Sequence, residues 1–100
     1  MKLLRIRWTD IALDDLRGIR DYVAFDSPAR AQKLASRLRS SFERLRRFPR
    51  SGRLLRGFEA RGFREVIVAP YRIVYRETAR EIQVLRVWHG RRDLGDHDLD

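Results

Sequence analysis

The chain has 100 residues and a mass of 12.0 kDa, enough for one domain with a modest core, so we expect residues 1–100 to fold as a single unit. It carries a formal net charge of +9, with 21 arginines against two lysines, and its lack of cysteine excludes disulfides, thiol chemistry and cysteine-bound zinc. The first residues do not resemble a signal peptide and no apolar run approaches the roughly 20 residues of a membrane span, so we expect a cytoplasmic protein with no membrane partner.

The positive charge is concentrated in the middle of the chain. Residues 1–29 carry five basic and five acidic side chains, residues 30–92 carry 18 and five, and the last eight carry four acidic side chains and no basic one. Arginine binds carboxylates and phosphates through a planar fork, so the middle section suits an acidic protein or a phosphate backbone. A solvated arginine surface without a partner is the alternative interpretation.

A short strand and a helix are predicted at the start of the chain. Leu4, Ile6 and Trp8 alternate with arginines, which is the pattern of a half-buried strand. Thr9 is a typical N-cap for the amphipathic helix that follows, and this helix is expected to end near Asp26.

A second helix follows with almost no connection. Ser27 and Pro28 form a cap with proline at the first helical position, and Phe48-Pro49 ends the helix. Each helix has an apolar stripe, so the two should pack as an antiparallel hairpin against a common core.

The hydrophobic period changes to that of β-strands after residue 52. Residues 63–68, 71–76 and 81–88 are strand-like runs with short turns between them, and residues 54–58 are expected to form an extra short strand or an ordered loop. The resulting order, βααβββ, indicates an α+β fold with an antiparallel sheet packed against an α-helical hairpin.

The middle strand predicts which face of the sheet is charged. Tyr71, Ile73 and Tyr75 point to one face, which the helices should cover, and Arg72 and Arg76 point to the other. The second face is therefore expected to be open and basic.

Arg64 and Arg86, from the flanking strands, could join Arg72 and Arg76 on the open face, where four arginines would form an anion site. In the interpretation that the residues alone favour, Arg72 and Arg76 are ordinary outward residues that form ion pairs within the sheet. The carboxylates considered as partners are Glu65, Glu77 and Glu81.

His89 is the best candidate for proton transfer, because it ends the last predicted strand and the chain has only two histidines. Beside the arginines it could serve as general acid or base in phosphodiester cleavage, or it could simply cap the strand. The acidic tail, residues 95–100, is predicted to fray rather than to bind a metal, so neither a metal nor a cofactor is expected.

Four segments together resemble the RelE/ParE superfamily of type II toxins. They read "WTDIALDDLRGIRDYV", "FPRSGRLLRGF", "FREVIVAPYRIVYR" and "RVWHGRRD", occur in the family's order and span nearly the whole chain. The resemblance implies the fold that the hydrophobic pattern predicts.

RelE-like members of this superfamily cut messenger RNA in the ribosomal A site with basic residues and commonly a C-terminal tyrosine. Here one of the basic positions holds Val66, and no tyrosine follows Tyr75, so the ribonuclease set is incomplete. The residues that match it, with the histidine as proton carrier, are Arg64, Arg72, His89 and Arg91.

The first and last segments resemble ParE-like toxins most, which implies a DNA gyrase inhibitor, with a ribosome-dependent mRNA endoribonuclease as the alternative. The target-binding residues implied are Arg72, Arg76, Arg86, His89, Arg91 and Arg92. In a structural alternative, Asp93 pairs with one of the last two arginines and closes the C-terminus.

The resemblance also implies a ParD-like antitoxin, acidic and apolar, that wraps the helical hairpin and a sheet edge in a hetero-oligomer. The residues expected to bind it are Leu16, Ile19, Leu38, Phe42 and Leu45. A nucleic-acid-binding module without toxicity is a third interpretation, although no groove-reading helix or base-stacking motif stands out.

Overall fold

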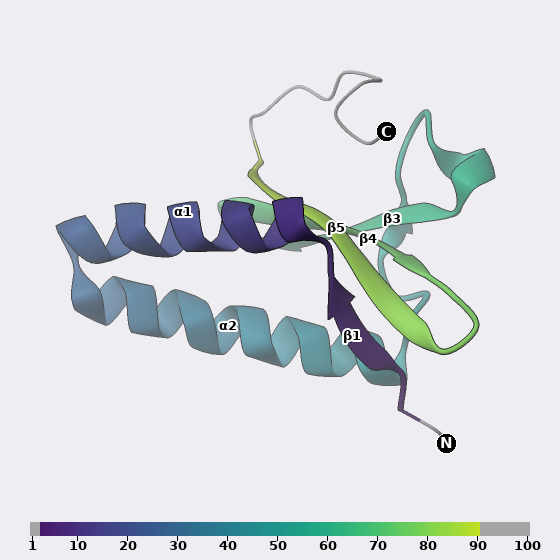
Figure 1. Ribbon diagram of the computed structural model, residues 1–100, viewed down its shortest axis with the longest axis horizontal. Coiled ribbons are helices and arrows are strands. Elements are labelled where there is room, and N and C mark those ends of the chain that lie inside the picture. Colours follow the sequence, from purple (N-terminus) through teal and green to yellow (C-terminus); the bar gives the residue numbers. More distant parts are fainter. Residues whose placement is uncertain (1–2, 91–100) are drawn as a thin grey trace.

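The computed structural model describes residues 3–90, in which two helices cover one face of a five-stranded sheet (Figure 1). The α+β class, the helical hairpin and the three-strand meander are all as predicted. In chain order the elements are β1 (Arg5–Trp8), α1 (Asp10–Asp26), α2 (Pro28–Arg47), β2 (Arg53–Leu54), the 3-10 turn η1 (Glu59–Arg61), β3 (Phe63–Val68), β4 (Tyr71–Glu77) and β5 (Glu81–His89).

The strands lie in the order β1-β5-β4-β3-β2. The pairs from β5 to β2 are antiparallel, as expected, but β1 runs parallel to β5, so the sheet is mixed. A parallel pair needs a long connection, and the helical hairpin with the three strands that follow it supplies one.

Capping residues fix both helices. The Thr9 hydroxyl accepts the Ala12 N–H at 3.1 Å and donates to the Leu85 carbonyl on β5 at 3.1 Å, so it begins α1 and ties the helix to the sheet. Ser27 ends α1, donating its N–H to the Val23 carbonyl at 2.8 Å, and its hydroxyl caps α2. One residue therefore serves both helices, which makes the hairpin tight.

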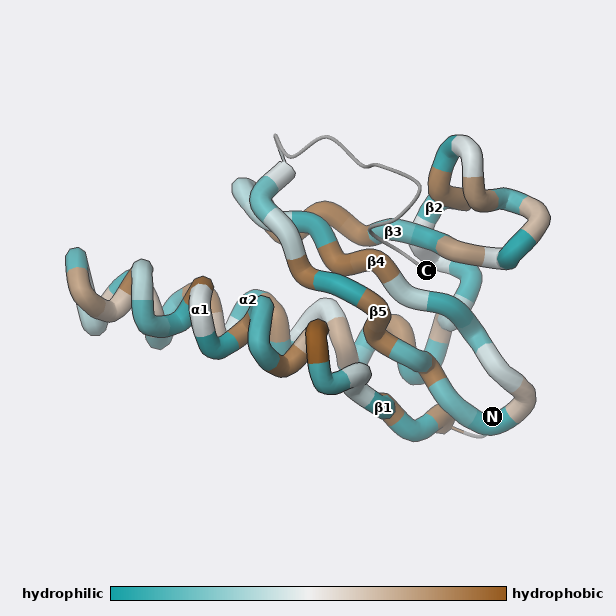
Figure 2. Tube along the Cα trace, turned by 45° about the horizontal axis from the view of Figure 1, so that its top comes forward, coloured by the Kyte–Doolittle hydropathy of each residue, from teal (hydrophilic) through white to brown (hydrophobic). Residues whose placement is uncertain are grey.

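The main core lies between the hairpin and the tyrosine face of the sheet. Ala12 and Leu34 from the helices pack with Ile73 and Val87 from β4 and β5. Hydrophobic and hydrophilic residues alternate along the central strands, as Figure 2 shows, so each strand has one face for this core.

The opposite face is less open than the sequence predicts. Leu55 and the half-buried Phe58, in the loop after β2, cover Phe63, Val74 and Trp88, and together these side chains form a second small core. The loop thus shields the centre of the face that was expected to be an exposed arginine surface.

Candidate functional site

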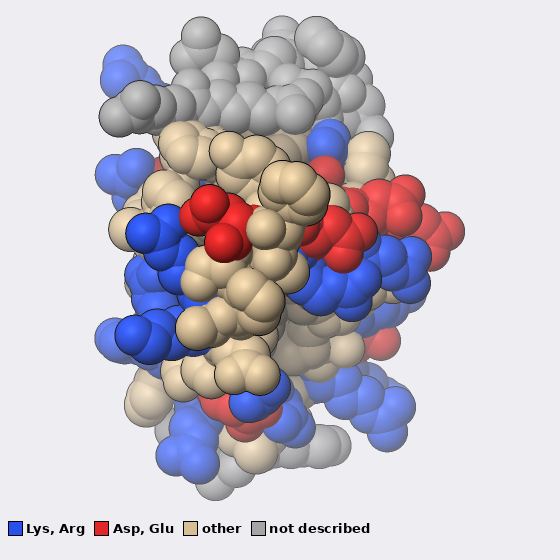
Figure 3. Space-filling model, turned by 90° about the vertical axis from the view of Figure 1, so that its left-hand side faces the viewer, with Lys and Arg blue, Asp and Glu red and all other residues tan. Residues whose placement is uncertain are grey.

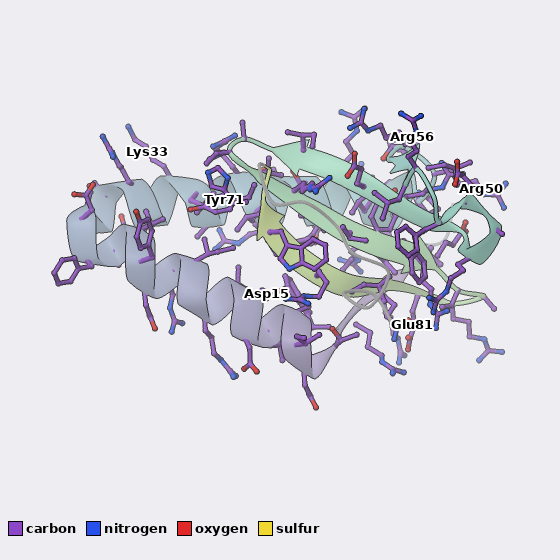
Figure 4. The ribbon with its side chains drawn as sticks, turned by 90° about the horizontal axis from the view of Figure 1, so that it is seen from above. Asp15, Lys33, Arg50, Arg56, Tyr71 and Glu81 are labelled. Atoms are coloured by element: carbon purple, nitrogen blue, oxygen red, sulfur yellow. The ribbon has the colours of Figure 1, made fainter. Side chains whose placement is uncertain are left out.

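Asp15 and Arg86 join α1 to the end of the sheet. The Asp15 carboxylate accepts hydrogen bonds from Arg86 Nε at 2.7 Å, from Arg86 Nη2 at 3.0 Å and from the Val87 N–H at 3.1 Å. Figure 4 shows Asp15 between α1 and the sheet. Because β1 pairs only with the first half of β5, Thr9 and Asp15 take over the edge of its second half.

Arg86 lies on the predicted arginine face, but it is committed to this pair. Its side chain is 11% exposed, and its guanidinium lies over the Trp88 ring, 4.5 Å from the centroid. Arg86 therefore fixes the last strand, and little of its charge reaches solvent.

Arg72 is held in a similar way by Glu65, one of the three carboxylates considered as partners. Glu65 is buried, and it accepts from Arg72 Nη1 at 3.1 Å and from Arg53 Nε at 2.7 Å. A buried carboxylate between two guanidiniums occupies the place where a phosphate would have to bind. The negative charge that Arg72 binds on this face is thus the Glu65 carboxylate.

Arg64 is not on the open face. The register places it opposite Tyr75, so it lies on the tyrosine face, where it donates to the Gly52 carbonyl at 2.8 Å. The expectation that it joins Arg72 is therefore wrong. The reason is the two-residue turn after Val68, which pairs Val68 with Tyr71 and puts even-numbered residues of β3 on the tyrosine side.

Tyr75 holds the segment between α2 and β2, to which Arg64 also donates. Its hydroxyl donates to the Pro49 carbonyl and accepts the Gly52 N–H, both at 2.9 Å. Burial raises the pKa of the Tyr75 phenol above its ordinary value, and the negative charge of Glu77 adds to this, against the Gly52 hydrogen bond and the positive charge of Arg64. Because both of its hydrogen bonds join it to the main chain of the loop before β2, the hydroxyl is a structural group.

Two further candidate residues, His89 and Arg76, lie on β5 and β4. His89 is exposed, and its ring makes an edge contact with Tyr71 at a centroid distance of 5.8 Å. Arg76 stands near the other end of β4, where its Nε donates to Gln83 at 2.7 Å. The structure therefore separates His89 from Arg76, and Arg91 and Arg92 lie outside the described residues.

The two helices form an apolar groove along the hairpin. It encloses about 450 Å³, and its charged lining residues are Arg17, Arg20, Arg39 and Glu43. Four of the five residues expected to bind an antitoxin line it, namely Leu16, Ile19, Leu38 and Phe42. The fifth, Leu45, lies elsewhere: it is 1% exposed and packs under Tyr75 and Ile82.

A second hollow of about 860 Å³ lies between the hairpin tip and the β3–β4 turn. Tyr22 and Phe25 at its rim are 78% and 96% exposed, and Arg30 and Lys33 stand beside them. Figure 3 looks at this end of the molecule and shows a central band of uncharged residues with both basic and acidic residues on either side. Large apolar side chains exposed in this manner are typical of a contact surface.

Sequence reasoning missed Asp15, whose role depends on where α1 meets β5 and has no local signal. Within residues 3–90 no cluster of three or more metal-binding side chains is present, and no helix there is both long and apolar enough to cross a bilayer.

A comparison with protein families decides the classification of this fold. The family described as "ParE toxin of type II toxin-antitoxin system, parDE" matches residues 6–94. The chain belongs to the ParE toxin family.

Related toxins support this membership. The chain is 36% identical over 91 residues to "Toxin RelE2" of Caulobacter vibrioides, covering 90% of this chain and 99% of that protein. It is also 36% identical over 91 residues to "Putative toxin Y4kP" of Sinorhizobium fredii, covering 89% and 91% of the two chains. The similarity thus extends over almost the whole of each protein.

Solved structures show the same fold as this ParE-family chain. A chain of the chromosomal ParDE system from P. aeruginosa matches with a TM-score of 0.70 and 26% identity, covering 87% of this chain and 96% of that one. A chain of the RelBE2 toxin-antitoxin complex from Mycobacterium tuberculosis matches with a TM-score of 0.63 and 28% identity, covering 87% and 98%. The chain is thus a toxin of the ParE/RelE type, in agreement with the resemblance seen in its sequence.

Proposed function

We propose that this toxin arrests growth by inhibiting DNA gyrase and that an acidic ParD-like antitoxin neutralises it. The observation that supports the proposal is that three candidate arginines already have hydrogen-bond partners within the protein. Arg64, Arg72 and Arg86 bind a main-chain carbonyl, Glu65 and Asp15 respectively. A ribonuclease needs cations directed at a phosphate, so this arrangement favours a toxin that acts by binding a protein.

Ribosome-dependent cleavage of mRNA is the second candidate, because one relative is named RelE2 and a similar structure comes from a RelBE2 complex. On that reading His89 would transfer the proton. It would have to work with Arg72 while Glu65 is in contact with that arginine.

Two assays distinguish the targets. Purified toxin is added to a gyrase supercoiling reaction and, separately, to translating ribosomes with primer-extension mapping of the message. Loss of supercoiling with intact message is the expected result. Cuts at codon positions in ribosome-bound message, with normal supercoiling, would replace the gyrase proposal with the ribonuclease.

The arginine pair that follows β5, Arg91 and Arg92, is proposed to contact the target. Arg91→Ala combined with Arg92→Ala should weaken inhibition of gyrase without altering the far-UV circular dichroism. Arg80→Ala is a matched control, because it removes an exposed positive charge at the opposite end of β5. Full inhibition by the double variant would favour the alternative in which Asp93 pairs with these arginines.

The groove of the hairpin is proposed to bind the antitoxin. An amphipathic helix with an acidic side fits an apolar groove that has arginines along its rim. Ala35 lines the groove and is exposed, so Ala35→Trp should fill it without disturbing the core and abolish neutralisation. Ala29→Trp, an exposed position on the same helix that does not line the groove, should leave neutralisation intact.

Co-expression gives a simpler test of the partner. We expect the toxin alone to be toxic or poorly soluble in growing cells, and co-expression with the adjacent open reading frame to cure both. Ready expression of the toxin alone in dividing cells would count against the proposal.

A further inference from the structure

A row of basic side chains runs along one side of α2. Lys33, Arg37, Ser40 and Arg44 follow one another at spacings of three and four residues, so all four lie on the same face of the helix. All four are exposed, and Figure 4 shows Lys33 extending away from the hairpin. The row is about 17 Å long, because each helical residue rises by about 1.5 Å.

The positive charge of this row is not neutralised by neighbouring carboxylates. Within residues 3–90 the side chains of Lys33, Arg37 and Arg44 form no ion pair, and Arg37 donates its Nη1 to the Ala69 carbonyl at 2.8 Å. By contrast, the candidate arginines of the sheet already have partners within the protein. Three positive charges on α2 are therefore available to a polyanion.

Three hollows beside this row join into one trough. The first, of about 860 Å³, lies at the hairpin tip and shares Arg37 with the second, of about 370 Å³, between α2 and β3. The second shares Ser41 and Ile67 with the third, of about 490 Å³, which reaches β2. The trough thus follows the basic row from the tip of the hairpin to the edge of the sheet.

Two carboxylates also line the trough, but both already have basic partners. Asp26 pairs with Arg30 at 3.3 Å, and Glu65 accepts a hydrogen bond from Arg53 Nε at 2.7 Å. Four serines line it as well, namely Ser36, Ser40, Ser41 and Ser51. Lysine, arginine and serine side chains are typical contacts of nucleic-acid phosphates, so the lining suits a phosphate backbone.

Two exposed aromatic rings stand at the tip end of the trough. Tyr22 and Phe25 are 78% and 96% exposed, and both line the first hollow together with Lys33. Bases of a single strand stack on such rings, whereas the bases of a duplex are already stacked on one another. The rings beside the basic row therefore favour a single strand over a duplex.

We propose that a single strand of nucleic acid binds along this trough. Its phosphates contact Lys33, Arg37 and Arg44, and its bases stack on the rings of the hairpin tip. At a stacked spacing of about 3.4 Å per phosphate, the basic row spans about five phosphates. The site is separate from the groove on the other side of α2, and it does not depend on gyrase being the target.

Fluorescence anisotropy with labelled strands of about ten nucleotides, within the usual site size of such proteins, tests the site. A single strand should bind at least about tenfold more tightly than a duplex of the same sequence. The logarithm of its association constant should fall with that of the salt concentration at a slope of about −2, because three cations each release about 0.7 counterion. Tighter binding of single-stranded DNA or RNA supports the site and identifies the class of strand. Equal binding of the duplex overturns it, since a basic chain attracts any polyanion.

Removal of charge within and outside the row locates the strand. Lys33→Gln combined with Arg44→Gln should weaken single-strand binding about tenfold and reduce the salt slope by about 1.4. Arg5→Gln combined with Arg80→Gln is the matched control, because it removes the same charge from exposed positions where β1 meets the β4–β5 turn. The control should bind within about twofold of the unmodified chain. An equal loss in both double variants refutes a site on α2.

Substitution of Phe25 separates base stacking from apolar contact with a protein. Leucine is apolar but has no aromatic face, so Phe25→Leu should weaken single-strand binding about fivefold. Unchanged binding would exclude stacking on this ring and overturn the proposal. A dimer of the free toxin in sedimentation that Phe25→Leu dissociates would also overturn it, because a second copy would then cover the tip.

Cross-linking of the unmodified chain gives a result that does not depend on any variant. A bound strand that contains iodouracil bases should attach to Tyr22 or Phe25 on irradiation, and mass spectrometry of the peptides identifies the position. Attachment confined to β4 or β5 would place the strand on the sheet and overturn the proposal. The gyrase assay is read separately, so an unaffected supercoiling reaction would refute the proposed target and leave this site standing.

Discussion

The Asp15–Arg86 pair should stabilise this fold more than any ion pair on the surface, and Asp15→Ala tests this. The carboxylate accepts three hydrogen bonds, and the two side chains are 14% and 11% exposed. Breaking a fully buried pair costs about 3–5 kcal/mol, because it leaves a charge without its partner in a poorly solvated place. Since water still reaches part of both side chains, we expect a loss of about 3 kcal/mol in the free energy of unfolding.

Thermal and urea unfolding, followed by circular dichroism, measure this loss. For a domain of this size each kcal/mol lowers the melting temperature by about 4–8 °C, so the variant should melt about 12–24 °C lower. Asp14→Ala is the matched control, because Asp14 precedes Asp15 on the same helix but pairs with Arg17 in the open, at 3.6 Å. We expect that control to change stability by less than about 0.5 kcal/mol.

A second substitution shows whether the unpaired charge causes the loss. Arg86→Met removes the charge but keeps much of the side-chain volume, so the Asp15→Ala, Arg86→Met double variant should regain at least about 1 kcal/mol over Asp15→Ala alone. The reasoning is refuted if Asp15→Ala costs less than about 1 kcal/mol, or if the double variant is no more stable than the single one.

Three further outcomes are expected. Burial raises the pKa of Tyr75 above 10.0, so the neutral phenol is favoured in the folded state. Its contribution to the free energy of unfolding is complete below that pH and is lost as the pH rises further. Urea unfolding from about pH 9 to 11 should therefore show a smaller loss of stability with rising pH for Tyr75→Phe than for the unmodified chain. Gly52→Ala should destabilise the fold by more than about 2 kcal/mol in urea unfolding, because its Cβ would lie 2.5 Å from the Tyr75 hydroxyl and 2.8 Å from the Glu65 carbonyl. Phe25→Ser should leave the melting temperature within about 3 °C, since the ring is 96% exposed; a large drop in melting temperature would mean that the ring packs in the fold.

The elements themselves could be predicted because their signals are local. Thr9, Ser27 and Pro28 mark helix ends by chemistry that acts within three residues, and the structure begins both helices there. The strand runs also match, with β4 and β5 each one residue longer than expected. The parallel pairing of β1 was not anticipated, because a strand's direction relative to a distant partner leaves no mark in its own residues.

The candidate site was harder to predict because it depends on register. The side of Arg64 could have been found by counting back from the two-residue turn, since Val68 must face Tyr71. The side of Arg86 could not be found by counting from a turn, because a bulge opposite Val74 and Tyr75 shifts the register of β5 by one residue. Which carboxylate meets this arginine depends on that shift and on the angle at which α1 leaves β1.

The distribution of charge over the hairpin gives the antitoxin proposal a physical basis. α2 carries seven basic residues and one acidic residue, whereas α1 carries two basic and five acidic. Arg64, Arg72 and Arg86 of the sheet bind main-chain carbonyls, Glu65 and Asp15 respectively, and of the two helices α2 is the one with an excess of positive charge. The groove proposed to bind the antitoxin lies against this helix. An acidic chain bound there therefore relieves part of the electrostatic repulsion among the basic residues of α2.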